Sequence, residues 1–450
     1  MKLSGIIKTI NARLLGSGRD YIVSSFSTDS RTINPGEIFV ALNGKNFQGR
    51  DFISDAVKKG AAAVITDSFP ARYMPEDIPV LLVEKAEDAL ALIAKKHRQA
   101  VDIPLICVVG SNGKTTTKDL LSHILGMRYK VLKTEANYNN LIGVSKTLLN
   151  LKDHDIAVVE AGTNSPGEIS LSGGIIKPDI VITTNIGMSH LKGLKTLLGV
   201  LEEKIAMVEA LPKSGVWVKN LDDKMLRMVK YKGIKEIGFA IKSKEAGFRA
   251  ENIRLRSNGT GFCLSGEDFF LPLIGVHNVY NGMAAIAVSS LFMGRDLIRE
   301  AMLSFRASPG RMQVIVCRGF RLINDTYNAN PTSLMCAVSA LNSHGRQGRN
   351  YIVCADMLEL GSKADKLHYA CGKFIAKSKT ADTLILFGRH ISNMAKGAFD
   401  GGMKRSDIKI FKDKGEITVF LKGRIAKGDS VLIKGSRSMR MEEIVDGLTG

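Results

Sequence analysis

The chain has 450 residues, of which 45% are hydrophobic and 24% charged, and its net charge is +19. The length predicts about three domains, and the composition is typical of a soluble globular protein. The apolar runs are no longer than a strand and no signal peptide is expected, which argues against a membrane-spanning protein and favours a cytoplasmic one. The basic residues are spread along the whole chain, which argues against nucleic acid as the partner.

Residues 1–100 are predicted to form a first unit in which strands and helices alternate. Two polar loops in it, residues 27–31 and 43–51, carry hydroxyls, amides and an arginine, which suit a diphosphate and a base. Ordinary solvated loops are the alternative interpretation of the same residues. The predicted strands are 21–27, 38–42, 61–66 and 80–83, and the predicted helices are 51–59 and 86–100.

The segment 110–120, GSNGKTTTKDL, follows an apolar run at 105–109 and precedes an amphipathic pattern. This order predicts a buried parallel strand, a glycine turn and a helix, whose backbone N–H groups favour the phosphates of a nucleotide. Lys114 is expected to reach the outer phosphates, and the Thr115 hydroxyl is expected to hold Mg²⁺. The loop is a variant of the usual pattern, because Val108 occupies the position six residues before the lysine where glycine is typical.

The second unit, residues 101–308, places further polar side chains where its predicted strands end. Glu160 follows a strand, at the position where a nucleotide enzyme needs a second Mg²⁺ ligand, although a helix cap or a surface acid is the alternative. His190 follows another strand and is expected to point into the same crevice. Asn278 and Asn281 lie one turn apart at the start of an alanine-rich helix, so their amides are expected to face a purine and a phosphate.

The third unit, residues 309–450, again alternates strands with helices and predicts a Rossmann-like layout. It lacks a glycine-rich dinucleotide fingerprint, so a redox cofactor is not expected. Three polar loops, residues 325–331, 356–361 and 434–437, follow predicted strands and indicate a binding rim at the carboxyl ends of this sheet. The predicted strands are 321–324, 351–355, 383–387, 408–411 and 430–433, and the predicted helices are 332–341, 365–378, 391–399, 416–425 and 439–448.

Several motifs spread over the chain, from the TDSR segment at 28–31 to Met441, together resemble the Mur ligases. Among them, DTYNANP, DMLELG and KGSR point to the member of the family that adds D-alanyl-D-alanine, and the Asp-Asn-Pro-Arg stretch expected of the sibling that adds the third residue does not occur. The motifs are GSNGKTTT at 110–117, NYNNLIGV at 137–144, EAG at 160–162, HNVYNGMAA at 277–285, GRM at 310–312, DTYNANPTSL at 325–334, ADMLELG at 355–361 and KGSRSMRMEE at 434–443.

The resemblance implies an α/β ligase with three domains: residues 1–100 bind a UDP-N-acetylmuramoyl tripeptide, 101–308 form a P-loop domain that binds ATP and Mg²⁺, and 309–450 bring D-alanyl-D-alanine. It implies a reaction of peptidoglycan precursor synthesis. The γ-phosphoryl group of ATP converts the terminal carboxylate of the peptide to an acyl phosphate, and the dipeptide amine attacks it to give the amide, ADP and phosphate. The expected partners are these small molecules, and a monomer is expected.

The resemblance also implies a role for individual residues, with Arg311 and Asp325 reaching ATP only after the third domain rotates inward. The catalytic residues would be Lys114, Glu160, His190 and Lys204, and the metal ligands Thr115, Glu160, His190 and Lys204 as a carbamate. The ATP-binding residues would be Gly110, Ser111, Asn112, Gly113, Lys114, Thr115, Thr116, His277, Asn278, Asn281, Arg311 and Asp325. The substrate-binding residues would be Ser30, Arg31, Asn46, Asn139 and Asn140 on the UDP-sugar side, and Asn328 and Ser436 on the dipeptide side.

Three positions depart from the family pattern: Arg50 replaces a frequent histidine, Asn324 a frequent acid, and Ala206 a glutamate that often follows the lysine at 204. For Lys204 the alternative is a solvated helix lysine paired with Glu202 or Glu203.

Other functions remain as alternatives at this point. Another Mur-type or folylpolyglutamate-type ligase would share the central domain but not the first-unit loops or DTYNANP. A nucleic-acid-dependent P-loop motor would need an Asp-Glu pair after Val159, where Glu160 is followed by alanine. A non-catalytic nucleotide-binding protein would not need Glu160, His190 and Lys204 together.

Overall fold

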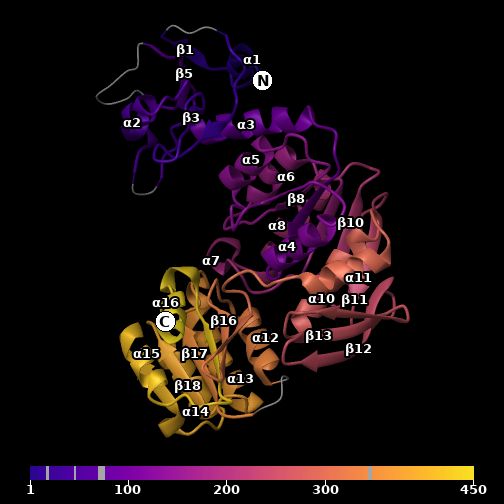
Figure 1. Ribbon diagram of the computed structural model, residues 1–450, viewed down its shortest axis with the longest axis vertical. Coiled ribbons are helices and arrows are strands. Elements are labelled where there is room, and N and C mark those ends of the chain that lie inside the picture. Colours follow the sequence, from indigo (N-terminus) through magenta and orange to yellow (C-terminus); the bar gives the residue numbers. More distant parts are fainter. Residues whose placement is uncertain (17–19, 45–46, 69–76, 343–346) are drawn as a thin grey trace.

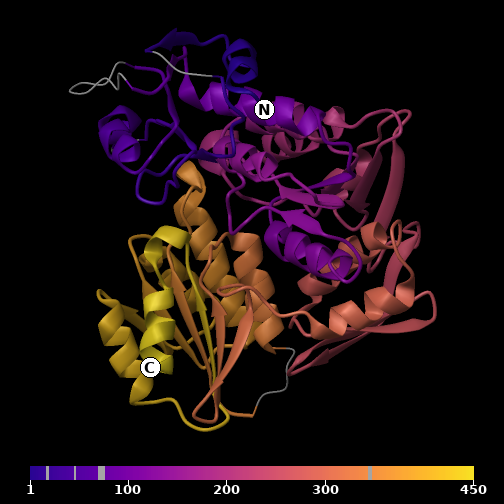
Figure 2. The same cartoon turned by 45° about the horizontal axis from the view of Figure 1, so that its top comes forward.

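The computed structural model describes the chain except for residues 17–19, 45–46, 69–76 and 343–346. The described strands form three sheets, and Figures 1 and 2 show the three units in chain order, with the central one between the other two. Helices lie against the sheets, so the predicted α/β class is confirmed. Among the described helices, none combines the length and the apolar character that a membrane crossing requires.

The first sheet has the strand order β1-β5-β4-β3-β2, and only the edge strand β1 runs antiparallel to its neighbour. The strand predicted at 21–27 is wrong in its first part, because Ile22 is 76% exposed and only a single bridge to Lys2 forms there. The sequence analysis also missed α1, although Leu3, Ile6 and Ile10 have helical spacing and are buried. The elements are α1 Leu3–Thr9, β1 Arg13–Leu15, β2 Phe26–Ser27, β3 Ile38–Val40, α2 Ile53–Lys58, β4 Ala63–Thr66, β5 Val80–Leu82 and α3 Ala86–Gln99.

The central sheet has the order β14-β13-β12-β11-β10-β9-β6-β8-β7, and its strands are parallel except at the β12–β13–β14 end. Its middle strand β6, LICVV, is buried throughout, and its side chains alternate between two cores on opposite faces of the sheet. The strands are β6 Leu105–Val109, β7 Val131–Lys133, β8 Ile156–Glu160, β9 Ile180–Thr183, β10 Val216–Asn220, β11 Lys235–Ala240, β12 Phe248–Arg256, β13 Gly259–Leu264 and β14 Glu267–Leu271.

Helices cover both faces of the central sheet, as its continuous apolar strands require. One core contains side chains of α4 and α10, and the other contains side chains of α5, α6 and α8. Helix α3 joins two units, because Ala91 and Ala94 pack into the central core while Leu90 and Ile93 pack into the core of the first unit. The helices are α4 Lys114–Leu125, α5 Leu141–Leu149, α6 Glu168–Ile176, α7 Leu191–Leu194, α8 Leu197–Ile205, α9 Lys224–Met228, α10 Val276–Ser289 and α11 Arg295–Ser304.

The third sheet has the order β15-β16-β20-β17-β18-β19, with β15 antiparallel at one edge. The sequence analysis missed β15, although residues 314–317 form an apolar run; as an edge strand β15 is only partly buried, and Val316 is 74% exposed. The other predicted strands and helices are confirmed within a few residues. They are β15 Gln313–Cys317, β16 Phe320–Asp325, α12 Pro331–Asn342, β17 Asn350–Ala355, α13 Ala364–Ser378, β18 Thr383–Phe387, α14 Ile391–Asp400, β19 Ile408–Phe411, α15 Lys414–Lys422, β20 Ser430–Lys434 and α16 Glu442–Thr449.

Candidate active site

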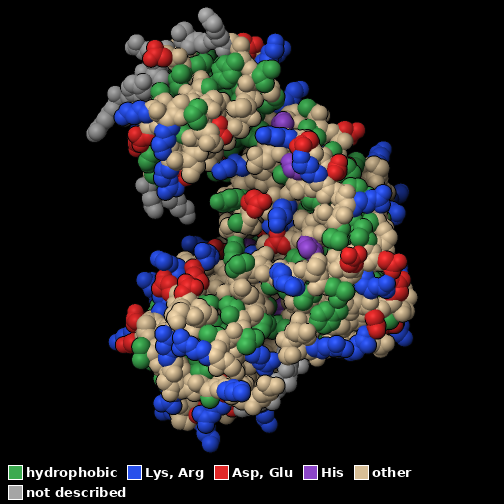
Figure 3. Space-filling model, in the orientation of Figure 1, with side chains coloured by type: hydrophobic (Ala, Val, Ile, Leu, Met, Phe, Trp, Pro, Cys, Tyr) green, Lys and Arg blue, Asp and Glu red, His purple; other side chains and the backbone are tan. Residues whose placement is uncertain are grey.

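A cavity of about 990 Å³ lies between the central and third units. Its walls are the loop before α4, the loops after β8 and β9, the start of α10, and the loops after β16, β17 and β20. The carboxyl ends of two parallel sheets therefore meet at one site, as open α/β sheets favour for ligands. Figure 3 shows a broad hollow between the first and third units on this face of the molecule, with charged side chains on its walls.

The glycines of the predicted phosphate loop are required by close contacts. A Cβ atom at Gly110 would lie 2.0 Å from Thr184 Oγ1, and one at Gly113 would lie 2.3 Å from Asn281 Oδ1. Gly113 has a left-handed conformation and precedes α4, which begins at Lys114, two residues before the predicted start. Loop residues 111–116 line the cavity. The predicted strand, glycine turn and helix are confirmed.

Lys114 points back along this loop. Its Nζ donates a hydrogen bond to the carbonyl oxygen of Gly110 at 2.9 Å. Burial lowers the pKa of Lys114, Glu160 raises it and Arg311 lowers it further. A nucleotide phosphate would offer this ammonium a stronger, charged acceptor than the carbonyl that it now contacts.

Glu160 forms a polar cluster with the phosphate loop. Its side chain is 1% exposed, and its two carboxylate oxygens accept hydrogen bonds from Thr115 Oγ1 and Asn139 Nδ2, each at 2.7 Å. The alternative of a surface acid is therefore wrong. Asn140 was expected beside it on the substrate, but its side chain caps α5 by accepting a hydrogen bond from the Gly143 N–H.

Lys204 is completely buried, and its Nζ has no hydrogen-bond partner among the described residues. Burial, with the nearby charge of Lys114, holds its pKa well below the usual range. The alternative of a solvated lysine is wrong, and Glu203 instead accepts hydrogen bonds from the backbone N–H groups of Gly167 and Ile169. Burying an amine without a partner is unfavourable, so Lys204 is a candidate functional residue, although it does not line the cavity itself.

Asn278 and Asn281 are buried at the start of α10 and line the cavity. Asn281 Nδ2 donates to Asn278 Oδ1 at 2.9 Å, and Asn278 Nδ2 donates to the Ile274 carbonyl at 2.8 Å. The two amides are thus oriented by each other rather than free. His277 lines the cavity beside them.

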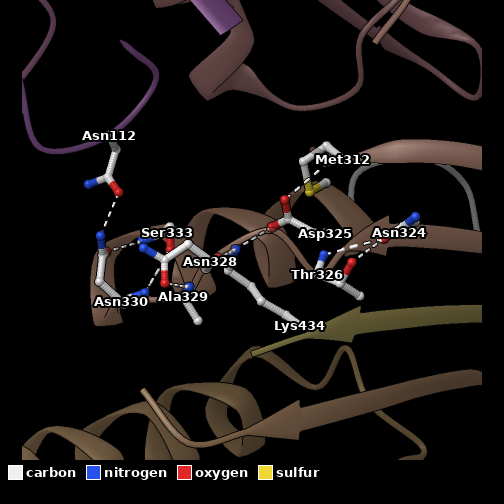
Figure 4. A network of polar contacts seen from close by, with 10 residues as sticks. All are labelled: Asn112, Met312, Asn324, Asp325, Thr326, Asn328, Ala329, Asn330, Ser333 and Lys434. Atoms are coloured by element: carbon white, nitrogen blue, oxygen red, sulfur yellow. Dashed lines mark hydrogen bonds and ion pairs between the residues drawn. The ribbon is translucent and has the colours of Figure 1, made fainter. Parts of the chain in front are cut away.

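The third unit contributes a buried ion pair that the sequence analysis missed (Figure 4). Lys434 Nζ lies 2.5 Å from Asp325 Oδ2 and donates to the Asn328 carbonyl at 2.9 Å, and its side chain is 3% exposed. The KGSR motif could have predicted this ion pair, because a lysine at the end of a buried strand needs an acidic partner nearby. Asn330 Nδ2 reaches across to Asn112 Oδ1 on the phosphate loop at 2.6 Å.

Arg311 contacts the phosphate loop in the domain arrangement of this structure, and its expected approach to ATP after a rotation stays a prediction. Its Nη2 donates to Thr115 Oγ1 at 2.8 Å, and its guanidinium stacks 3.8 Å from the ring centre of Tyr327. The stacking holds the long side chain in place. Asp325 differs, because its carboxylate is engaged by Lys434 and by the Met312 N–H.

The residues predicted for the UDP-sugar do not all gather at this cavity. Ser30 is buried in the first unit, and the exposed Arg31 pairs with Asp29 at 2.8 Å. Lys146 on α5 donates to Thr28 at 3.3 Å, which links this loop to the central unit. Asn46 lies outside the described residues. On the other side, Asn328 and Ser436 line the cavity, and Ser436 Oγ accepts a hydrogen bond from the Leu358 N–H.

We expect Lys434→Ala to lower the free energy of unfolding by about 3–5 kcal/mol, because it leaves the Asp325 carboxylate in a mostly buried place without its counter-charge. Chemical denaturation measures the change. Lys85→Ala is the control, since Lys85 and Asp88 form an ion pair in which both side chains are more than half exposed, and about 1 kcal/mol or less is expected there. Equal losses in the two variants would contradict the prediction.

Comparisons with known proteins cover almost the whole chain. Residues 22–98 match the Mur ligase family, catalytic domain; residues 108–289 match the Mur ligase middle domain; and residues 310–437 match the Mur ligase, glutamate ligase domain. The chain is 34% identical to the UDP-N-acetylmuramoyl-tripeptide--D-alanyl-D-alanine ligase of Bacillus subtilis (strain 168), over 95% of this chain and 93% of that protein.

Two solved structures share the fold over similar lengths. The crystal structure of MurF from Acinetobacter baumannii has a TM-score of 0.89 at 27% identity and covers 99% of this chain and 98% of its own. The MurF ligase from Thermotoga maritima, solved in complex with ADP, has a TM-score of 0.84 at 26% identity and covers 95% of this chain and 97% of its own.

Proposed function

The chain belongs to the Mur ligase family, and on this premise we propose that it joins D-alanyl-D-alanine to a UDP-N-acetylmuramoyl tripeptide at the expense of ATP. The family resemblance seen in the sequence is thereby confirmed, and a nucleic-acid motor is set aside. In the proposal the first unit, residues 1–100, binds the UDP-muramoyl peptide, residues 101–308 bind ATP, and residues 309–450 bring the dipeptide. The reaction supplies peptidoglycan precursors in the cytoplasm.

One observation carries the proposal: phosphate-loop, acidic and third-unit side chains meet at Thr115. Its hydroxyl contacts Glu160 at 2.7 Å and Arg311 at 2.8 Å. An enzyme that transfers a phosphoryl group between two substrates needs positive groups and a metal-binding oxygen pair at one point. Thr115 and Glu160 provide the oxygen pair, and Lys114 and Arg311 provide the positive groups.

The residues fit a bound Mg²⁺, because the Thr115 hydroxyl and the Glu160 carboxylate are adjacent oxygen ligands of the kind that this cation prefers. A carbamate on Lys204, whose Nζ has no hydrogen-bond partner among the described residues, would add a further anionic oxygen. His190 lines the cavity. Bound there, Mg²⁺ would neutralise charge on the phosphates of ATP.

The protein's own groups account for the remaining steps of the proposed mechanism. Lys114 and the N–H groups at the start of α4 hold the phosphates, which places the γ-phosphoryl group for attack by the peptide carboxylate. A carboxylate is a poor electrophile, and phosphorylation supplies a leaving group for attack by the dipeptide amine. Arg311 is placed to stabilise the charge that develops on the acyl phosphate oxygens. Asn328 and Ser436 lie on the wall from which the dipeptide would enter.

Phosphate release by the purified protein tests the function. With ATP, Mg²⁺ and D-alanyl-D-alanine, release should depend strictly on added UDP-N-acetylmuramoyl tripeptide, and it should stop when L-alanyl-L-alanine replaces the D,D-dipeptide. Mass spectrometry should detect the pentapeptide product. Phosphate release at an equal rate without either substrate, or release supported by a folate and glutamate instead, would reject the proposal in favour of another activity.

We expect Arg311→Ala to reduce amide formation about tenfold or more, because it removes a positive group from the phosphate site. The affinity for the UDP-substrate, measured by calorimetry on the full chain, should stay unchanged, because that ligand is assigned to the first unit. Lys409→Ala, on the remote strand β19, is the control for the loss of one positive charge. A lost affinity for the UDP-substrate in Arg311→Ala would contradict the assignment.

A further inference from the structure

Glu359, which no step above uses, contacts His190 across the boundary between the third and central units. His190 Nδ1 lies 2.8 Å from Glu359 Oε2. The backbone supports the same contact, because the Lys192 N–H donates to the Glu359 carbonyl at 3.0 Å. Both residues line the cavity. Nδ1 is buried and makes no hydrogen bond of ordinary geometry among the described residues, so the 2.8 Å approach to Glu359 is a close contact that a small rotation of either side chain would turn into a hydrogen bond.

The two partners share an unfavourable backbone conformation. The φ angle is 53° at His190 and 64° at Glu359, both in the left-handed region that favours glycine. Such conformations cost stability and persist where the surrounding structure imposes them, which occurs preferentially at functional sites. Here the two left-handed residues face each other in one side-chain contact.

The loop that carries Glu359, residues 356–361, is held from several directions. The Met357 N–H donates to Nε2 of the fully buried His368 at 2.9 Å, and the Leu358 N–H donates to Ser436 Oγ at 2.8 Å. The Met357 and Leu360 side chains are buried beneath the loop. The backbone of this loop therefore holds Glu359 next to His190, although the Glu359 side chain is about half exposed.

We propose that Glu359 is a positioning residue for His190. Its carboxylate accepts a hydrogen bond from Nδ1–H, which favours the tautomer with the proton on Nδ1 and directs Nε2 at the cavity. A carboxylate on one ring nitrogen sets the tautomer and orientation of a histidine whose other nitrogen serves a metal ion. Because Glu359 belongs to the third unit, His190 takes this state only when that unit is docked. The inference depends on the proposed function in one respect, namely that Nε2 faces a bound Mg²⁺.

Glu359→Gly is the test variant, because it removes the carboxylate while relieving the left-handed backbone. It should be at least as stable to chemical denaturation as the wild type, since glycine suits this conformation and a half-exposed ion pair contributes little. The Mg²⁺ concentration for half-maximal phosphate release should rise about 10- to 100-fold. Glu359→Gln, whose amide oxygen still accepts a hydrogen bond from Nδ1–H, should lose less.

The readout that does not depend on activity is the tautomer of His190. In protein labelled with ¹⁵N-histidine, two-bond ¹H–¹⁵N spectra should show the Nδ1–H form in the wild type and a mixture in Glu359→Gly, with His190→Gln used to assign the signal. Asp365→Asn is the matched control: Asp365 makes the same kind of contact with His390 Nδ1, at 2.7 Å, and neither residue lines the cavity. It should change neither the His190 signal nor the Mg²⁺ requirement.

The outcomes separate this inference from the proposed function. An unchanged tautomer together with an unchanged Mg²⁺ requirement in Glu359→Gly would overturn the inference while leaving the function intact. Loss of stability with an unchanged tautomer would also overturn it, since Glu359 would then be structural. If the wild type releases no phosphate with its two substrates, the function fails, and the tautomer spectra still decide whether Glu359 positions His190.

Discussion

Lys114→Ala should remain folded and lose turnover by about a hundredfold or more, which corresponds to about 3 kcal/mol of transition-state stabilisation. The physical reason is that the ammonium of Lys114 lies at the cavity wall formed by the phosphate loop, and transfer of a phosphoryl group depends on charge neutralisation and positioning. Folding should be little affected, because Lys114 Nζ donates only to the Gly110 carbonyl of the same loop.

Steady-state phosphate release and thermal unfolding measure the two parts of this prediction. The control is Lys133→Ala, which removes a lysine that is 42% exposed, pairs with Asp119 at 3.8 Å and does not line the cavity. It should retain wild-type turnover. Near-normal turnover of Lys114→Ala would show that the phosphate loop does not act in the reaction, even though its backbone has the predicted geometry.

Lys204→Ala should be nearly inactive and should regain part of its activity when a short carboxylate such as acetate or formate is added. The substitution opens a buried space where the carboxylate would replace a carbamate. Lys204→Met is the matched control, because its side chain fills that space and leaves no room for the added anion. It should be equally inactive, at least as stable as the wild type in buffer free of CO₂, and not rescued.

The lowered pKa of Lys204 predicts how the activity should change with pH. Carbamate formation requires the neutral amine, and burial holds the pKa of Lys204 well below the usual range, so the neutral form is populated at lower pH than for a surface lysine. Activity should therefore fall as pH drops through this lowered pKa, and also on removal of CO₂. Incorporation of ¹³CO₂ should give a carbamate signal in ¹³C NMR that is absent from Lys204→Met.

A wild-type protein without this ¹³C signal, combined with full activity of Lys204→Ala, would rule out the carbamate.

The order of elements and the phosphate loop were determined by the sequence itself. Strands such as β6 and β18 were predicted from continuous apolar runs, because a parallel strand buried on both faces has few other compositions available. The turn at Gly110 and Gly113 was predicted from the glycine, lysine and threonine pattern between a strand and a helix. The structure gives the physical reason, since positive φ angles and close contacts with the Thr184 and Asn281 side chains exclude a Cβ atom there. The edge strands β1 and β15 were missed: β1 has only three residues and is largely exposed, and the apolar run in β15 was not interpreted as a strand.

Only the tertiary structure decided which polar residues meet. Glu160 and Thr115 are far apart in the chain, and neither their 2.7 Å contact nor the contact of Arg311 with Thr115 follows from either local sequence. Burial decided the state of Lys204, because a lysine on a short helix has the same local pattern in solvent as in a core. The pairing of Asp325 with Lys434, and of Glu359 with His190, depends on the packing of separate strands and units, which local residue patterns do not encode.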